Sequence, residues 1–393
     1  MIQGQIMNTY PEPPVTFVEG RGTVLVDSQG KEYLDFLSGL AVTSLGHARK
    51  EVVDAIATQA GVLTHVSNLY GNLVRSEVAG IIDELLFEAT RVHGKVFFCN
   101  SGAEANECAL KLARRMNPGR FRIVTTTKSF HGRTLATLAA TGQPEKHTPF
   151  TPMPEGFDLV EFGDLDAVTK LLSTGEIAGV LVEALQAEGG INTPPKGYLP
   201  ALQQACRDHG ALFMVDEVQS GLGRTGAWFA FQDEDLSPDV VTLAKSLGNG
   251  MPVGACWAKE HVADMFGVGD HGSTFGGQPL AMAAAKATLE TLVAIDAPQK
   301  ASHASSKLTK GLSKLSGVAK MRGRGLLLGA ELNEANAKEV TLAALDHGLV
   351  VNAVAPNVVR FTPPLTVSDN EIGEAILRFG LALDEVAAKG SLS

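Results

Sequence analysis

Six short apolar segments, separated by helical stretches, constrain the fold of this chain more than any other feature. The segments cover residues 95–100, 121–127, 177–184, 211–217, 239–245 and 254–258. Amphipathic helical patterns such as those of residues 50–60 and 76–89 alternate with them. Strands that are apolar along their whole length need cover on both faces. The pattern therefore predicts an α/β fold in which helices cover both sides of a mainly parallel sheet.

The rhythm changes at both ends of the chain, which indicates a second, smaller domain. The first forty or so residues contain short strands and turns, and after about residue 293 helices and strands follow an α+β pattern. A chain of 393 residues is long enough for two or three domains. We predict a large domain of residues 45–290. The small domain combines residues 1–44 with residues 291–393, because the N-terminal strands need a partner sheet.

Composition narrows the class of protein. The net charge of −10 argues against nucleic acid and anionic membranes as partners. No uncharged apolar run approaches the roughly 18 residues of a membrane span, and no signal-peptide pattern is present. The four cysteines show no CxxC spacing and the histidines no HxH or HExxH spacing, so we predict no metal site. We expect a cytoplasmic protein with reduced thiols.

The turn at Ser101-Gly102 lies between an apolar segment and a predicted helix. Backbone N–H groups at a helix start point outward and can bind a phosphate. Ser101 and Glu104 also have the spacing of a capping box, which needs no ligand. The local sequence leaves both interpretations open.

Two charged positions follow apolar segments where a ligand site would lie. Asp216 and Glu217 end one segment, and Lys245 ends another before a glycine-rich loop. Taken alone, a lysine in such a place is usually a solvated surface residue. The carboxyl ends of parallel strands share one edge of the sheet, however, and doubly wound folds bind ligands there. A phosphate-binding turn, a carboxylate and a lysine at one edge match pyridoxal phosphate.

Six sequence segments give the chain a resemblance to a known family. They cover residues 97–107, 130–134, 216–226, 243–255, 272–281 and 358–365, in this order. From about residue 10 to the last predicted helix, the chain resembles the class III (subgroup II) pyridoxal-phosphate aminotransferases. The resemblance implies a fold-type-I transferase whose large domain has a mainly parallel seven-stranded sheet. It also implies a homodimer with the active site at the subunit interface.

The resemblance implies a set of cofactor-binding residues, namely Ser101, Gly102, Ala103, Phe130, Asp216, Glu217, Val218, Gln219, Lys245 and Thr274. In the family pattern, Gly102 and Ala103 bind the phosphate. Thr274, supplied by the neighbouring subunit, completes the phosphate site.

The remaining cofactor residues of the family pattern surround the pyridine ring. Phe130 stacks on one face and Val218 packs on the other. Asp216 pairs with the ring nitrogen, and Gln219 contacts the phenolic oxygen. Lys245 bonds to the cofactor aldehyde and, once displaced by a substrate amine, moves the proton between the reacting carbons. Asp216 and Lys245 are the expected catalytic residues.

Four further positions are expected to bind substrate. The implied reaction transfers the terminal amino group of N-acetylornithine to 2-oxoglutarate, in arginine biosynthesis. Arg133 would hold the α-carboxylate of acetylornithine and the distal carboxylate of 2-oxoglutarate, while Arg360 would hold the carboxylate beside the reacting carbon. Acetylornithine has no carboxylate there, so we expect Glu188 to pair with Arg360 until the keto acid arrives. Ser273 would also reach the substrate.

Several alternatives stay open on the sequence alone. Succinylornithine, succinyldiaminopimelate, ornithine and 4-aminobutyrate aminotransferases share the cofactor residues and differ in a few pocket contacts. A 2,1-aminomutase or a non-catalytic protein could keep the same fold. Gly323-x-Gly325 has part of a dinucleotide-binding pattern, but Gly329 is one residue late, so a turn and strand of the smaller domain is the favoured interpretation.

Overall fold

The computed structural model describes residues 5–390 and contains a central sheet of seven strands. In spatial order these are β4 (Gly94–Cys99), β10 (Gly254–Lys259), β9 (Val240–Leu243), β8 (Leu212–Asp216), β7 (Ile177–Val182), β5 (Arg122–Thr126) and β6 (Phe157–Val160). All neighbours pair in parallel except β10, which is antiparallel to both β4 and β9. The chain therefore has the expected α/β fold with a mainly parallel seven-stranded sheet.

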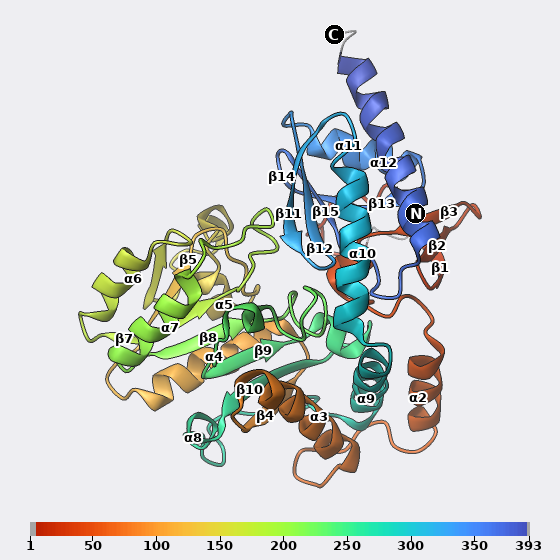
Figure 1. Ribbon diagram of the computed structural model, residues 1–393. Coiled ribbons are helices and arrows are strands. Elements are labelled where there is room, and N and C mark those ends of the chain that lie inside the picture. The colour runs from red at the N-terminus through yellow and green to blue at the C-terminus, as the bar shows by residue number, and fades with distance from the viewer. Residues whose placement is uncertain (1–4, 391–393) are drawn as a thin grey trace.

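Both faces of this sheet are buried, as the apolar segments predict. Along β8, Leu212 and Met214 belong to one hydrophobic cluster, and the alternate residues Phe213 and Val215 belong to another. Because successive side chains of a strand point to opposite faces, the two clusters lie on the two sides of the sheet. In Figure 1 helices lie on both sides of the strands in the lower part of the molecule.

Helices account for most of the remaining regular structure. They are α1 (Ser38–Ala41), α2 (Lys50–Ala60), α3 (Leu73–Thr90), α4 (Gly102–Met116), α5 (Leu135–Ala140), α6 (Leu165–Leu172), α7 (Tyr198–Asp208), α8 (Glu260–Ala263), α9 (Pro279–Ala294), α10 (Ala297–Leu312), α11 (Ala337–Asp346) and α12 (Asp369–Gly390). Within residues 5–390, none of these helices is both long and apolar enough to cross a membrane.

Two four-stranded sheets lie apart from the central one. The first has the order β1 (Phe17–Arg21), β2 (Val24–Asp27), β3 (Glu32–Asp35) and β13 (Leu349–Val350), and the second β11 (Val318–Arg324), β12 (Leu327–Leu332), β15 (Val358–Phe361) and β14 (Asn352–Ala355). Figure 1 shows them in the upper part of the molecule with α11 and α12.

The parallel pairing of β3 with β13 joins the N-terminal strands to the C-terminal part of the chain. The division into residues 45–290 and residues 1–44 with 291–393 stays a prediction, and residues 1–4 and 391–393 lie outside the described residues. The glycine pattern around Gly323 and Gly325 forms the turn between β11 and β12, where Gly325 has a φ of 53°. These glycines thus shape a β-hairpin, as expected, and not the strand-to-helix turn of a dinucleotide site.

Candidate active site

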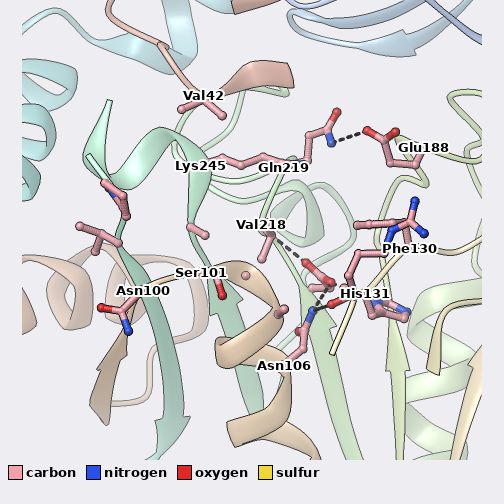
Figure 2. Close-up of a pocket in the computed structure, with 18 of the residues that line it drawn as sticks. Val42, Asn100, Ser101, Asn106, Phe130, His131, Glu188, Val218, Gln219 and Lys245 are labelled. Carbon is pink, nitrogen blue, oxygen red and sulfur yellow. Dashed lines mark hydrogen bonds and ion pairs between the residues drawn. The ribbon is translucent and has the colours of Figure 1, made fainter. Parts of the chain in front are cut away.

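A cavity of about 390 Å³ opens at the carboxyl ends of the parallel strands. Among the residues expected to bind cofactor or substrate, these line it: Ser101, Gly102, Ala103, Phe130, Arg133, Glu188, Asp216, Val218, Gln219 and Lys245. They come from segments that follow β4, β5, β7, β8 and β9. Figure 2 shows Lys245, Gln219 and Glu188 across the upper part of the pocket, with Ser101, the residue before α4, and Asn106 of α4 below. The topology therefore gathers residues spread over more than a hundred positions.

Asp216 is the last residue of β8 and is only 4% exposed. Its Oδ2 atom accepts a hydrogen bond from Nδ2 of Asn106 at 2.7 Å and lies 2.8 Å from Nδ1 of His131. Its Oδ1 atom accepts from the backbone N–H of Val218 at 3.0 Å. A buried carboxylate held by three partners is fixed in position, and it faces a cavity large enough for a cationic ring.

Lys245 follows β9 and has a φ of +39°, in the left-handed region that costs a non-glycine residue free energy. Burial lowers the pKa of its amine, while the charges of Glu188 and Asp216 oppose that shift and Arg360 adds to it. An amine with a lowered pKa is neutral for more of its time near pH 7. It can then attack a carbonyl or accept a proton.

The start of α4 fits a phosphate group and is also capped. Ser101 Oγ accepts from the backbone N–H of Glu104 at 3.2 Å, which is one half of the capping box considered from the sequence. The Glu104 carboxylate accepts from the backbone N–H of Asn100 instead of that of Ser101. The same turn lines the cavity. A Cβ on Gly102 would lie 2.7 Å from Cγ1 of Val218, so any larger residue would displace one cavity wall. Helix N–H groups, a buried acid and a buried lysine together fit pyridoxal phosphate.

Arg360 lies on β15 and is fully buried, with its guanidinium directed at two residues of the cavity wall. It forms an ion pair with Glu188 and donates from Nη1 to Oε1 of Gln219 at 2.8 Å. Gln219 in turn donates from Nε2 to Oε1 of Glu188 at 3.0 Å. The Nε atom of Arg360 donates to Oδ1 of Asn352 at 3.1 Å, while its Nη2 atom is buried with no hydrogen-bond partner within residues 5–390.

The charge of this cluster is balanced inside the protein. Burial alone would raise the pKa of Glu188, but the charges of Arg360 and Lys245, with the hydrogen bonds from Arg360 and Gln219, lower it to about 2. Glu188 is therefore ionised at neutral pH and neutralises Arg360.

The other expected substrate residues lie nearer the surface. Arg133 is exposed at the cavity, with its guanidinium 5.6 Å from the ring centre of Phe130. Ser273 lies outside the cavity lining but accepts a hydrogen bond from Asn100, which does line it, at 3.2 Å. Thr274 is exposed beside it. Its expected role in a neighbouring subunit's site is consistent with this exposure and stays a prediction.

The structure does not bring Glu217 to the cavity. Its carboxylate accepts hydrogen bonds from Ser220 Oγ at 2.6 Å and from the backbone N–H of Phe231 at 3.0 Å. Successive residues after a strand point in opposite directions, so Asp216 and Glu217 diverge. Glu217 is thus placed as a buried structural acid, and the structure gives no support to its expected contact with the cofactor.

We expect the variant Glu217→Gln to weaken the dependence of stability on pH. Burial raises the pKa of Glu217 to about 7 from its ordinary 4.5. The folded protein therefore keeps this proton while the unfolded chain loses it, and stability falls as pH rises from 4.5 through 7. The loss is on the order of 3 kcal/mol. Glutamine can keep both contacts, because its oxygen accepts from the backbone N–H of Phe231 and its amide N–H can donate to the Ser220 hydroxyl, and it cannot ionise. Urea unfolding between pH 5 and 8 measures the difference, and parallel curves for the two proteins would contradict it.

Several residues that line the cavity are absent from the sequence prediction, among them His131, Asn106 and Glu183. Asn106 of α4 lines the cavity and links Asp216 to Thr242 of β9, whose hydroxyl donates to the Asn106 oxygen at 2.8 Å. Glu183 follows β7, is 5% exposed and also lines the cavity. Glu183 ends an apolar strand just as Asp216 does, so the same argument could have found it.

Within residues 5–390, no group of three or more His, Cys, Asp or Glu side chains could hold a metal ion. The fold and the site instead define an enzyme that uses pyridoxal phosphate. The conclusion rests on a lysine, an acid and a helix start that converge on one cavity at the edge of a mainly parallel sheet.

Comparison with known proteins identifies the family. The chain matches the family described as Aminotransferase class-III over residues 6–383, and it belongs to that family. It is 44% identical to the acetylornithine aminotransferase of Corynebacterium efficiens, covering 98% of this chain and 96% of that protein. Its function is therefore that of an aminotransferase with pyridoxal phosphate as cofactor.

Solved structures agree with this assignment. The ornithine aminotransferase of Toxoplasma gondii superposes with a TM-score of 0.92 at 31% identity, covering 98% of this chain and 94% of that one. The N-acetylornithine aminotransferase of Stenotrophomonas maltophilia superposes with a TM-score of 0.83 at 34% identity, covering 97% and 98%.

Proposed function

We propose that this aminotransferase transfers the terminal amino group of N-acetylornithine to 2-oxoglutarate, giving N-acetylglutamate 5-semialdehyde and glutamate. The closed Arg360–Glu188 pair carries the proposal. A donor that reacts at a terminal amine brings no carboxylate to Arg360, so the protein must neutralise that buried cation itself. Relatives named as acetylornithine aminotransferases, at 42–44% identity, support this donor over ornithine.

The chain's own residues account for how the two substrates are held. Arg133 is exposed at the cavity with no ion pair within residues 5–390, so it is available for a substrate carboxylate. In the first half-reaction this would be the α-carboxylate of acetylornithine. In the second, 2-oxoglutarate offers two carboxylates, one for Arg133 and one for Arg360, with Glu188 displaced. Once Glu188 has moved away, Nη2 of Arg360, which has no hydrogen-bond partner within residues 5–390, would be a further donor for that second carboxylate.

Proton transfer falls to Lys245. Bound pyridoxal phosphate supplies a cationic ring that takes up the electron pair left when a proton leaves the reacting carbon. Asp216 favours the protonated ring nitrogen, and Asn106 and His131 hold this carboxylate in place. The Nζ atom of Lys245, with its pKa lowered by burial, would accept the proton from the donor carbon and deliver it to the cofactor carbon on the other side of the transferred nitrogen.

We expect Glu188→Gln to separate donors that react at a terminal amine from donors that react at an α-amino group. Without the carboxylate, Arg360 is unpaired when acetylornithine binds, whereas an α-amino acid such as glutamate brings its own carboxylate. The ratio of kcat/KM for acetylornithine to that for glutamate should fall at least about tenfold. Steady-state kinetics with both donors measure this ratio, and equal losses for the two donors would remove the proposed role.

A panel of amino donors with 2-oxoglutarate tests the proposed substrate. Acetylornithine should have the highest kcat/KM among acetylornithine, succinylornithine, succinyldiaminopimelate, ornithine and 4-aminobutyrate. Incubation with acetylornithine alone separates a transaminase from a 2,1-aminomutase, because a transaminase stops after one turnover with its cofactor aminated. Continued conversion without a keto acid would contradict transamination.

We propose in addition that two copies of the chain form a homodimer. Large apolar side chains are exposed on the segment of residues 61–73, with Leu69 and Leu73 more than four-fifths exposed. Asn68 joins this segment to the loop that carries Thr274, because its Nδ2 donates to the carbonyl of Ser273 at 2.9 Å. An apolar surface next to the expected intersubunit residue fits a second copy. A monomer in analytical ultracentrifugation would contradict this.

The four buried free cysteines also fit the proposed cytoplasmic location.

A further inference from the structure

The carboxylate of Glu183 connects two loops that both contribute to the cavity wall. Its Oε1 atom accepts the backbone N–H of Phe130 at 2.9 Å, and its Oε2 atom accepts the backbone N–H of Ala187 at 3.1 Å. Glu183 makes no ion pair within residues 5–390 although it is only 5% exposed. A buried, unpaired carboxylate is costly, so its two hydrogen bonds have to offset a large desolvation penalty.

Each of these loops presents a side chain that the proposed reaction uses. The loop after β5 carries Phe130 and His131, and His131 contacts Asp216 at 2.8 Å. The loop after β7 carries Glu188, the residue next to Ala187, which pairs with Arg360. One side chain therefore fixes the backbone of the expected ring-stacking residue and, at the same time, the backbone beside the Arg360 counter-ion.

We propose that Glu183 is a positioning residue that locks these two loops together, so that Glu188 leaves Arg360 by side-chain rotation on a fixed backbone. The part that concerns Glu188 rests on the proposed function, whereas the locking of the loops does not. A neutral side chain of the same shape could not take over this role, because both side-chain oxygens must accept a hydrogen bond. A glutamine has one acceptor and one donor, so it would set N–H against N–H at one of the two loops.

The surroundings of Glu183 agree with a role that needs a fixed acid. Its pKa is raised to about 7 overall: burial and the nearby charge of Asp216 raise it, while His131 and the two backbone hydrogen bonds lower it. An apolar residue would avoid the cost of burying a carboxylate but could not accept these two hydrogen bonds, which are the feature that Glu183 adds.

The variant Glu183→Gln tests the proposal, with Asp83→Asn as a matched control. Asp83 also accepts a backbone N–H from another element, that of Gly94 at 2.8 Å, but it lies at the opposite end of β4 from the cavity. Both variants should lower the melting temperature. The rate of backbone hydrogen–deuterium exchange is then measured in the proteins freed of cofactor. Relative to the native protein, it should rise about tenfold in residues 128–134 or 184–190 of Glu183→Gln, and it should not rise there in Asp83→Asn.

A second measurement connects the lock to ligand binding. The dissociation constant of pyridoxal phosphate should rise about tenfold in Glu183→Gln and stay unchanged in Asp83→Asn. Native exchange rates in both segments of Glu183→Gln would overturn the proposal, as would the same increase in Asp83→Asn. Because exchange is measured without any amino donor, a wrong substrate assignment would leave this result intact, and the two proposals fail separately.

Discussion

Replacing Lys245 by alanine should abolish transamination while leaving the cavity able to bind pyridoxal phosphate. The amine of Lys245 is expected both to bond the cofactor and to move the proton, and among residues 5–390 no other lysine lines the cavity. Loss of an attacking amine and a general base together should lower kcat by at least about 10⁴-fold. Turnover of acetylornithine with 2-oxoglutarate, measured over hours with high enzyme concentration, gives the residual rate.

Covalent attachment gives an independent measurement for the same variant. Borohydride should fix the cofactor to the native protein in a ratio of one per chain and should not fix it to Lys245→Ala. Lys170→Ala, which removes an exposed lysine of α6, is the matched control and should behave as the native protein does. Turnover by Lys245→Ala at the native rate would contradict the assigned role, whatever the borohydride result.

The central sheet could be predicted from the sequence because its strands are apolar on both faces. Six of its strands correspond to the six apolar segments. The seventh, β6, is a four-residue edge strand with three half-buried residues, so it lacks a long apolar run. The antiparallel direction of β10 could not be predicted from periodicity, since a strand has the same pattern in either direction. The direction of β10 depends on the short connection that joins it to β9 through the turn containing Lys245.

The residues of the site likewise include some that the sequence could predict and some that it could not. Asp216 and Lys245 follow buried strands, and charged residues at such places stand out against their apolar surroundings. Asn106 gave no such signal, because one polar residue within a helix usually faces solvent. Its burial follows from the packing of α4 across the sheet, which only the three-dimensional arrangement reveals. The family resemblance supplied the remaining residues, and for Glu217 the structure places the side chain elsewhere.

Replacing Asp216 by alanine should lower kcat by about 10³-fold, the second largest effect expected here. Without the carboxylate, nothing favours the protonated form of the ring nitrogen, so the ring withdraws electrons less strongly in the transition state. The variant also leaves Nδ2 of Asn106 and Nδ1 of His131 without the partner they share. Some loss of stability is therefore expected, and thermal unfolding has to show that the variant is folded at the assay temperature.

A cofactor with a methyl group on the ring nitrogen separates the chemical effect from the structural one. Its ring is cationic without any help from the protein, and alanine at position 216 leaves room for the methyl group. The methylated cofactor should therefore restore at least about a tenth of the kcat that Asp216→Ala has lost. It should restore nothing in Lys245→Ala, because that variant lacks the amine that moves the proton. If the methylated cofactor left Asp216→Ala as slow as before while the variant remained folded, Asp216 would act only by holding Asn106 and His131 in place. The proposed charge interaction with the ring would then be wrong.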